Sequence, residues 1–277
     1  MKTALVLEGG AMQGIYTAGV LDMFMGHKVS FDGVIGVSAG ALFGVNFLSG
    51  QQGRGLRYNK KYNKNPNYMG LWPLIKEGNI VGTDYAYHTV PCVLDPFDDE
   101  AFMASGIPFY AVLTDIVAGK AEYRLIESVY RQMDELRASG SMPYVSKPVE
   151  IGGKLYLDGA VCDSIPYDYM LEHGYDRVVV VLTKPADYVK KPLPVKLTER
   201  LYGKDYPNFA QAVESRHLMY KRQQDRLSEL AEKGIAKVIR PSESYYVNKL
   251  ERNNKKLQKL YDLGLKDAMD FLKKESV

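Results

Sequence analysis

A serine stands between two glycines in the stretch GVSAG, where Gly36, Ser38 and Gly40 alternate with small residues. Apolar Val34 and Ile35 come just before it and an apolar segment with helical spacing follows, so the pattern predicts a strand, a sharp turn and a helix. The amino end of such a helix favours negative charge that develops beside the serine hydroxyl. Serine is also a preferred helix N-cap, which is the alternative role. The glycines on both sides lead us to predict a nucleophile at Ser38.

A second glycine-rich turn, EGGAMQG, occupies residues 8–14 and follows a β-prone run at 3–7. One interpretation is a dinucleotide phosphate loop. That pattern needs a glycine where Ala11 stands and an acidic residue at the end of a second strand, which Asp32 does not provide. The other interpretation is an oxyanion hole made by the backbone amides of Gly9, Gly10 and Ala11, donors worth roughly 3–4 kcal/mol each in other acyl-transfer enzymes. We favour the oxyanion hole, because it gives both glycine turns the same task.

A serine nucleophile needs a group that accepts its proton, and the chain offers four histidines. None of them occupies the strand-to-loop position that hydrolase histidines favour. His217 does follow every candidate aspartate, as the order Ser–Asp–His requires, so a His-dependent esterase stays an alternative that replacement of His173 or His217 would test. The four are His27, His88, His173 and His217.

The stretch KLYLDGAVCDSIP places Asp158 at the end of a predicted strand, the same kind of position as Ser38. A solvated aspartate, with a pKa of about 3.9, is a weak base. Desolvation and a hydrogen bond from the serine would make it adequate, and the carboxylate would also orient the hydroxyl. An aspartate before a glycine is also a common turn residue, which is the alternative role.

Two strand–turn–helix units near the start of the chain predict a parallel sheet covered by helices. The run VVVVL at 178–182 is apolar at every position, which suits a strand buried on both faces. Prolines between 183 and 208 predict a connector. Helices are expected at 210–233 and at about 246–273, the second with an apolar face that docks on the core. Further strands are predicted at 109–114, 154–157 and 236–239.

The 277-residue chain carries a net charge of +3 that is unevenly distributed. Lysine and arginine number 15 against 20 acidic residues over 1–183, and 21 against 13 over 184–277. The basic last third either meets phosphate groups or forms a solvated helical surface. Cys92 and Cys162 are predicted to be reduced thiols. The apolar run at the start of the chain is too short for a signal peptide. No stretch approaches the roughly 20 apolar residues that span a membrane. These two observations predict a cytoplasmic protein.

The stretch at 53–74 is basic and rich in tyrosine and asparagine. One hypothesis is that it rims an entrance for anionic head groups with interfacial aromatic side chains, and the alternative is a polar surface hairpin or helix. The residues concerned are Arg57, Lys60, Lys61 and Lys64, with Tyr58, Tyr62, Tyr68 and Trp72.

Four stretches taken in order, EGGAMQG, GVSAG, SGSMPYVSKPVEIGG and LDGAVCDSIP, resemble the patatin-like phospholipases, serine lipid acyl hydrolases that use a Ser–Asp dyad without histidine. The resemblance runs from residue 3 to about 170. It implies a three-layer α/β/α sandwich around a mostly parallel central sheet. It also implies Ser38 as nucleophile, Asp158 as general base, and Gly9, Gly10 and Ala11 as the oxyanion-hole loop. The other motif positions are Gly14, Gly36, Gly40, Gly159 and Ala160.

The chain departs from that family pattern at three positions. Ala11 replaces the usual third glycine, and its amide can still donate if its φ angle tolerates a Cβ. Gln13 stands where lysine or arginine is usual, so the electrostatic help of that side chain for a phosphate is lost. Ser164 takes the place of a common asparagine.

The resemblance implies a hydrolase that cleaves acyl esters of lipids, a phospholipase A or lipid acyl hydrolase, through an acyl-serine intermediate and without a metal or organic cofactor. We expect a catalytic domain at 1–185 and a basic, mainly helical region at 186–277 packed on it. The expected partners are a lipid or acyl-ester substrate and, transiently, an anionic membrane surface at the inner face, with no nucleic acid. The alternatives are the His-dependent esterase and a non-catalytic acyl- or phosphate-binding protein.

Overall fold

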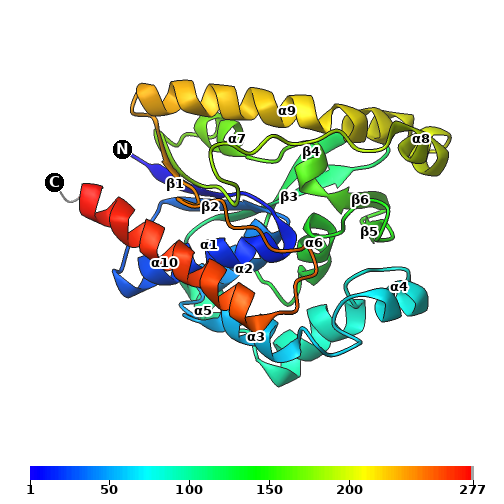
Figure 1. The fold of residues 1–277 in the computed structure, drawn as a ribbon, viewed down its shortest axis with the longest axis horizontal. Coiled ribbons are helices and arrows are strands. Elements are labelled where there is room, and N and C mark those ends of the chain that lie inside the picture. The colour runs from blue at the N-terminus through cyan, green and yellow to red at the C-terminus, as the bar shows by residue number, and fades with distance from the viewer. Residues whose placement is uncertain (276–277) are drawn as a thin grey trace.

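The computed structural model describes residues 1–275, in which eight strands form one mixed sheet with helices on both faces (Figure 1). The strand order is β5-β6-β3-β2-β1-β7-β8, with β4 paired to β3. The predicted α/β sandwich and its helical C-terminal region are confirmed.

The strands are β1 (Thr3–Leu7), β2 (Gly33–Val37), β3 (Phe109–Asp115), β4 (Lys120–Leu125), β5 (Val149–Ile151), β6 (Lys154–Asp158), β7 (Arg177–Val181) and β8 (Ala236–Ile239). The helices are α1 (Ile15–Gly26), α2 (Ala39–Leu48), α3 (Arg54–Tyr62), α4 (Leu71–Glu77), α5 (Asp99–Ala104), α6 (Met133–Ser139), α7 (Tyr167–Glu172), α8 (Val195–Thr198), α9 (Pro207–Glu232) and α10 (Asn254–Glu275).

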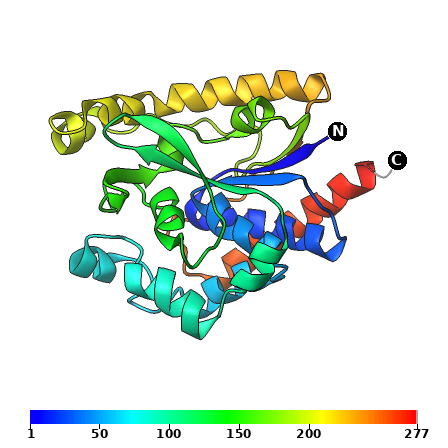
Figure 2. The ribbon, with the colours of Figure 1, turned by 180° about the vertical axis from the view of Figure 1, so that it is seen from behind.

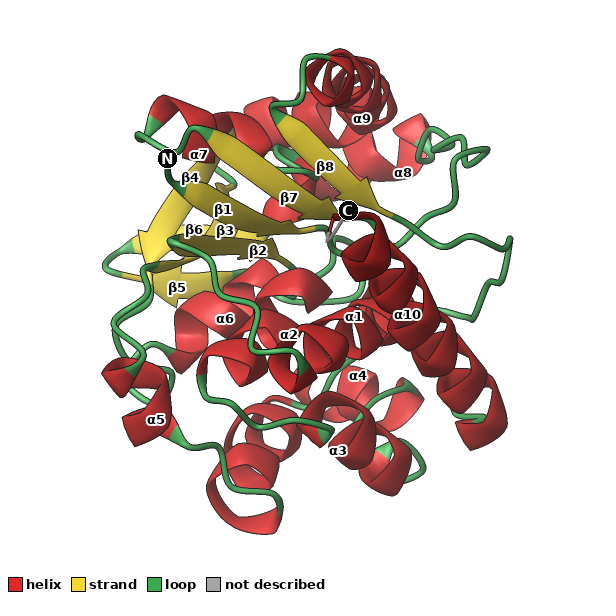
Figure 3. Ribbon diagram, turned by 90° about the vertical axis from the view of Figure 1, so that its left-hand side faces the viewer, coloured by secondary structure: helices red, strands yellow, loops and turns green. Residues whose placement is uncertain are grey.

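Five neighbouring strands, β3-β2-β1-β7-β8, run parallel through the centre of the sheet. Strands β1, β2 and β7 are apolar at nearly every position because helices cover both of their faces. Helices α7 and α9 lie on one face, and α1, α2, α6 and α10 lie on the other (Figure 3). The strands predicted at 3–7, 109–114, 178–182 and 236–239 are confirmed.

The opposite end of the sheet is antiparallel, with β4 and β6 both paired to β3 and β5 paired to β6. The hairpin of β3 and β4 is visible in green in Figure 2. Strands β4 and β5 were not predicted. The residues of β4 (KAEYRL) do alternate between charged and apolar, but lysine, glutamate and alanine favour strands only weakly and the strand is only partly buried. The strand predicted at 154–157 is confirmed as β6, and it runs antiparallel to β3.

The C-terminal helix α10 packs closely against α1, and the two cross at glycines. A Cβ on Gly19 would overlap the carbonyl oxygen of Tyr261, and a Cβ on Gly264 would overlap that of Tyr16. The hydroxyl of Tyr16 also donates to Asp267 Oδ2 at 3.0 Å. The apolar face predicted for this helix is docked on the core, although α10 begins at residue 254 rather than 246. The division of the chain at 185/186 stays a prediction.

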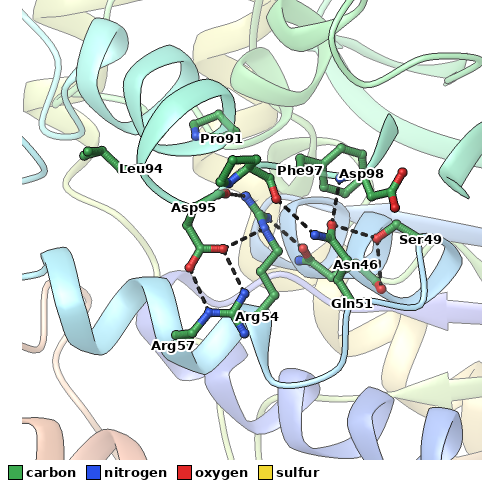
Figure 4. A network of polar contacts seen from close by, with 12 residues as sticks. Asn46, Ser49, Gln51, Arg54, Arg57, Pro91, Leu94, Asp95, Phe97 and Asp98 are labelled. Atoms are coloured by element: carbon green, nitrogen blue, oxygen red, sulfur yellow. Dashed lines mark hydrogen bonds and ion pairs between the residues drawn. The ribbon is translucent and has the colours of Figure 1, made fainter. Parts of the chain in front are cut away.

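Residues 54–104 form a further helical layer beneath α1 and α2 (Figure 3), including a π-helical segment at Thr83–Leu94. A partly buried network of polar contacts holds this layer together (Figure 4). Asp95 accepts two hydrogen bonds from Arg57, at 2.8 and 2.9 Å, and its carbonyl oxygen accepts one from Arg54 at 2.7 Å. Arg54 in turn donates to Asn46 Oδ1 of α2 at 2.8 Å, which ties the layer to the core. No described helix is long and apolar enough to cross a bilayer.

Candidate active site

Strands β2 and β6 meet end to end along one edge of β3, and this register brings two predicted residues together. Val37 at the end of β2 is opposite Val112, and Asp158 at the end of β6 is opposite Leu113. Both strands must use the same edge of β3, because β4 pairs along residues 110–115 on the other edge. The strands run toward each other, so the residue after Val37, which is Ser38, faces Asp158.

The two side chains are in direct contact: Ser38 Oγ donates to Asp158 Oδ2 at 2.8 Å. Both residues are buried, with 6% and 5% of their surface exposed. The other carboxylate oxygen of Asp158 accepts from the backbone N–H of Ala160 at 2.9 Å. Burial raises the pKa of Asp158 above its ordinary value, against the opposing effects of the Arg216 charge and these hydrogen bonds. A raised pKa makes this carboxylate a stronger base than a solvated one.

The backbone of Ser38 is strained, with φ 57° and ψ −125°. Its N–H donates to Ser139 Oγ at 2.9 Å, and the carbonyl oxygen of Ser141 accepts from the N–H of Asp158 at 2.8 Å. The short segment 139–141 therefore holds the backbone of both residues. In the sequence this SGS stretch was recognised only as part of a motif. Its role depends on contact with Ser38, which lies 101 positions earlier in the chain than Ser139.

The motif glycines lie where the backbone approaches other atoms closely. A Cβ on Gly9 would lie 2.8 Å from Ser38 Cβ, and one on Gly36 would lie 2.6 Å from the nitrogen of Ala41. Similar obstructions face the remaining motif glycines: Gly10 meets Thr183, Gly14 meets Ala39, Gly40 meets the oxygen of Leu7, and Gly159 meets that of Val112. The two glycine turns are thus packed directly on each other around Ser38.

The loop of Gly9, Gly10 and Ala11 faces the same space as Ser38. Within residues 1–275, the amides of these three residues donate to no other part of the chain. Ala11 adopts a left-handed conformation with φ 51°, a region that glycine fills more readily. Gln13 is buried and binds the 245–247 segment: its Nε2 donates to the Tyr245 carbonyl oxygen at 3.0 Å, and its Oε1 accepts from the N–H of Val247 at 3.0 Å.

Ser38 lies at the junction of two cavities of opposite character. The first is apolar, has a volume of about 150 Å³ and extends between α2, α3, the 83–94 segment and α6. The second, called the polar cavity for its charged side chains, also has apolar residues in its lining and has a volume of about 230 Å³. Ala11, Ser38, Met142 and Lys249 line both. The cations that line the polar cavity are Lys184, Lys190, Lys191, Arg216 and Lys249.

The hypothesis of a basic and aromatic entrance at 53–74 is wrong for its three tyrosines, and the alternative of a helix is found at Arg54–Tyr62. Tyr58 and Tyr68 line the apolar cavity, and Tyr62 is buried in the core. Arg57 is paired with Asp95 (Figure 4), so its charge is already neutralised. Of the aromatic residues proposed for an interface, Trp72 on α4 is exposed.

None of the four histidines, all of which lie within the described residues 1–275, forms a hydrogen bond with Ser38 Oγ, whose partner is Asp158. His217 lines the polar cavity, but its Nδ1 lies 2.9 Å from the carbonyl oxygen of Glu214 and the partner of Ser38 Oγ is Asp158. Nδ1 of His27 and of His173 is hydrogen-bonded to the backbone of its own helix, and His88 is exposed. Among the described residues, no group of three or more histidine, cysteine or acidic side chains could hold a metal ion.

Comparison with known proteins gives two family matches. The model described as "Patatin-like phospholipase" matches residues 5–171, and a domain of unknown function matches residues 206–276. The uncharacterized protein YjjU of Escherichia coli is 30% identical over 206 residues, which is 73% of this chain and 57% of that protein. An uncharacterized NTE family protein of Mycobacterium tuberculosis is 28% identical over 60% of this chain and 44% of its own length.

Among solved structures, VipD from Legionella pneumophila aligns with 99% of this chain and 67% of its own, at a TM-score of 0.48 and 12% identity. The chain spans about half the length of the two curated relatives named above. The patatin-like match covers more than half of the 277 residues and contains Ser38, Asp158 and the glycine loop. The chain belongs to the patatin-like phospholipase family.

Proposed function

We propose that this protein hydrolyses acyl esters of lipids through a Ser38–Asp158 dyad and an acyl-serine intermediate. The observation that carries the proposal is the 2.8 Å hydrogen bond from Ser38 Oγ to Asp158 at the junction of an apolar and a polar cavity. The apolar cavity suits an acyl chain and the polar cavity suits the alcohol part of the ester. Family membership supports a phospholipase-type reaction.

In the first step, Asp158 accepts the proton of Ser38 while Oγ attacks the ester carbonyl carbon. The amides of Gly9, Gly10 and Ala11 have no partner within residues 1–275, and they are the donors we assign to the developing oxyanion. Collapse of the tetrahedral intermediate breaks the bond to the alcohol oxygen, which takes the proton from Asp158. The products of this step are the free alcohol and acyl-Ser38.

In the second step, a water molecule gives its proton to Asp158 and attacks the acyl carbonyl, and the same amides again hold the oxyanion. Release of Ser38 Oγ returns the proton to the serine and frees the fatty acid. Burial of Asp158 serves both steps, because it raises the pKa of the carboxyl toward that of a useful base.

The direct test is labelling of the purified chain with a fluorophosphonate, with the site read by peptide mass. We expect label on Ser38 in the unaltered protein and in His217→Gln, and none in Ser38→Ala. Asp158→Asn should slow labelling and ester hydrolysis by at least about a thousandfold, as loss of one member of a catalytic unit does elsewhere. Label that depends on His217 would instead favour a His-dependent esterase.

A folded, unlabelled protein that still binds a fatty acid in the apolar cavity would contradict the proposal. It would make the non-catalytic acyl-binding alternative the better description. Folding of each variant is checked by circular dichroism and thermal unfolding, so that loss of label is not confused with loss of structure.

A further inference from the structure

Four cationic side chains of the polar cavity come from the part of the chain that follows the patatin-like match at residues 5–171. Lys184 and Lys190 lie in the segment after β7, Arg216 lies on α9, and Lys249 precedes α10. Within residues 1–275, none of the four forms an ion pair with a carboxylate. Exposed Lys191 adds a fifth positive charge to the same cavity.

The partners that these cations do have are neutral. Lys190 Nζ donates to Ser164 Oγ at 3.1 Å and lies 4.0 Å from the centre of the Tyr220 ring. Arg216 Nε donates to the carbonyl oxygen of Ala160 at 2.7 Å. Hydrogen bonds of this kind orient these side chains without supplying a counter-charge, so an anionic ligand can still pair with them.

The two acidic residues that line the cavity are already engaged. Glu8 accepts from the N–H of Thr183 at 2.6 Å, from the Thr183 hydroxyl at 3.0 Å and from the Tyr220 hydroxyl at 2.7 Å. Asp158 accepts from Ser38 and from the backbone of Ala160. These carboxylates therefore offset only part of the charge of the cations around them.

Burial is the main cause that lowers the pKa of two of these lysines, and a neighbouring cation adds to it in each case against the opposing charge of Glu8. Burial lowers the pKa of Lys190 well below its ordinary value, and the nearby charge of Arg216 lowers it further. Burial and the charge of Lys249 lower the pKa of Lys184 in the same way. An anion bound among these side chains would relieve both penalties.

We propose that the polar cavity is a phosphate subsite, so that the preferred substrate is an acyl ester whose alcohol part carries a phosphate and no compensating cation. The inference rests on the proposed function, since an ester at Ser38 with its acyl chain in the apolar cavity leaves its alcohol in the polar one. One guanidinium and several ammonium groups are the donors that proteins use for phosphate. A quaternary ammonium beside the phosphate would be repelled by the same cations.

The replacement at position 13 fits this assignment. Gln13 lacks the positive charge that the family resemblance leads one to expect there, but its amide binds the backbone at 245 and 247. The N–H of Met12 also donates to the carbonyl oxygen of Lys249 at 3.4 Å. The glycine-rich loop thus holds in place a segment that carries a cation, and the charge reaches the cavity from the C-terminal region.

The test compares three oleoyl esters in the same detergent micelles, namely those of glycerol, glycerol 3-phosphate and glycerophosphocholine. We expect kcat/KM for the phosphate ester to exceed the values for the other two by at least about tenfold. Lys190→Gln and Lys249→Gln should each lower this preference several-fold. Arg222→Gln, which removes an exposed charge of α9 outside the cavity, is the matched control and should keep the preference.

Each other outcome has a definite meaning. Equal hydrolysis of the three esters would overturn the phosphate subsite and leave the proposed function intact. If no ester is hydrolysed and Ser38 takes no label, the proposed function fails, and the subsite is judged by thermal unfolding with glycerol 3-phosphate. Stabilisation that Lys190→Gln abolishes would support the subsite, and no stabilisation would overturn it. Stabilisation by inorganic phosphate without any preference among esters would indicate a free-anion site and overturn the head-group assignment.

Discussion

The two cavities that meet at Ser38 are built from different parts of the chain. The apolar cavity is lined by residues 11–142, with Lys249 and Leu250 at its margin. The polar cavity takes most of its charge from residues 184–249. The family segment thus supplies Ser38, Asp158 and the apolar cavity, whereas the later region supplies the cations. Under the proposed function, acyl-chain length and head group would be recognised by surfaces that can change independently.

Filling the apolar cavity is expected to change the kinetics most among the variants that distinguish the two cavities. Leu42 lines it close to Ser38, so Leu42→Trp should lower kcat/KM for a long-chain ester by about 10- to 100-fold through lost acyl-chain contacts. An acetyl ester should react nearly as well as before. The measurement is a chain-length series, with Leu218→Trp on the exposed face of α9 as control. If Leu42→Trp also changed the preference among head groups, the inference that the two cavities act independently would be contradicted.

The second effect concerns the junction itself. Ser139→Ala removes the acceptor of the strained Ser38 N–H and should lower kcat by about tenfold with little change in KM, because a buried unpaired donor costs about 1–3 kcal/mol. The loss should be equal for long and short acyl chains and for charged and neutral head groups. Steady-state kinetics on those four ester types checks it. A loss confined to one substrate type would show that Ser139 acts on a cavity rather than on Ser38.

The third effect is a dependence on pH that links the polar cavity to the dyad. Asp158 must be ionised to accept a proton and its pKa is raised by burial, so kcat/KM should rise with pH through a limb that lies above pH 3.8. The charge of Arg216 opposes this shift, so Arg216→Gln should move the limb to higher pH, while Leu42→Trp should leave it in place. A limb that does not move in Arg216→Gln would contradict electrostatic coupling between cavity and dyad.

The same shift has a consequence for stability. Because the pKa of Asp158 is higher in the folded protein than in the unfolded chain, the folded state binds more protons between the two values, and stability falls as pH rises through that window. Asp158→Asn should therefore raise the melting temperature at pH 7. The gain should disappear below pH 3.8, where the carboxyl is protonated in both states.

The smallest effect is expected outside both cavities, on α4. Leu71, Trp72 and Ile75 expose 73%, 54% and 79% of their surfaces, and exposed Lys76 lies beside them. We expect this face to contact an anionic lipid surface, so Ile75→Ser should lower hydrolysis of vesicle-bound substrate by about three- to tenfold. Hydrolysis of a soluble acetyl ester should not change. Equal loss on both substrates would assign Ile75 to folding rather than to lipid contact, and Leu218→Ser is the matched exposed control.

Local patterns in the sequence were sufficient for the parts of the site that depend on short stretches. The turn at Ser38, the glycine loop and the strand before Asp158 each follow from neighbouring residues. The antiparallel direction of β6 did not follow, because it is set by pairing with β3 across forty residues. Strand β4 was missed although its charged and apolar residues alternate, because lysine, glutamate and alanine favour strands only weakly and the strand is only partly buried.

Contacts between distant segments account for the rest. The hydrogen bond from Ser38 to Ser139 joins residues 101 positions apart, and the pairing of Arg57 with Asp95 depends on how the layer of residues 54–104 folds back (Figure 4). The basic excess after residue 183 was visible in the sequence. Its convergence on the cavity beside Ser38 required the packing of α9 and of the segment before α10.

The end-to-end meeting of β2 and β6 along β3 has a mechanical consequence. Val37, the residue before Ser38, and Asp158 are paired with the adjacent residues Val112 and Leu113 of β3, so bending or twisting of the sheet moves Ser38 and Asp158 together. Their separation is set by the pairing of β2 and β6 with β3 and by the hydrogen bonds of both residues to Ser139 and Ser141. An insertion in the exposed turn at 117–118 would therefore alter the outline of the molecule while leaving the pairing of β2 and β6 with β3 in place.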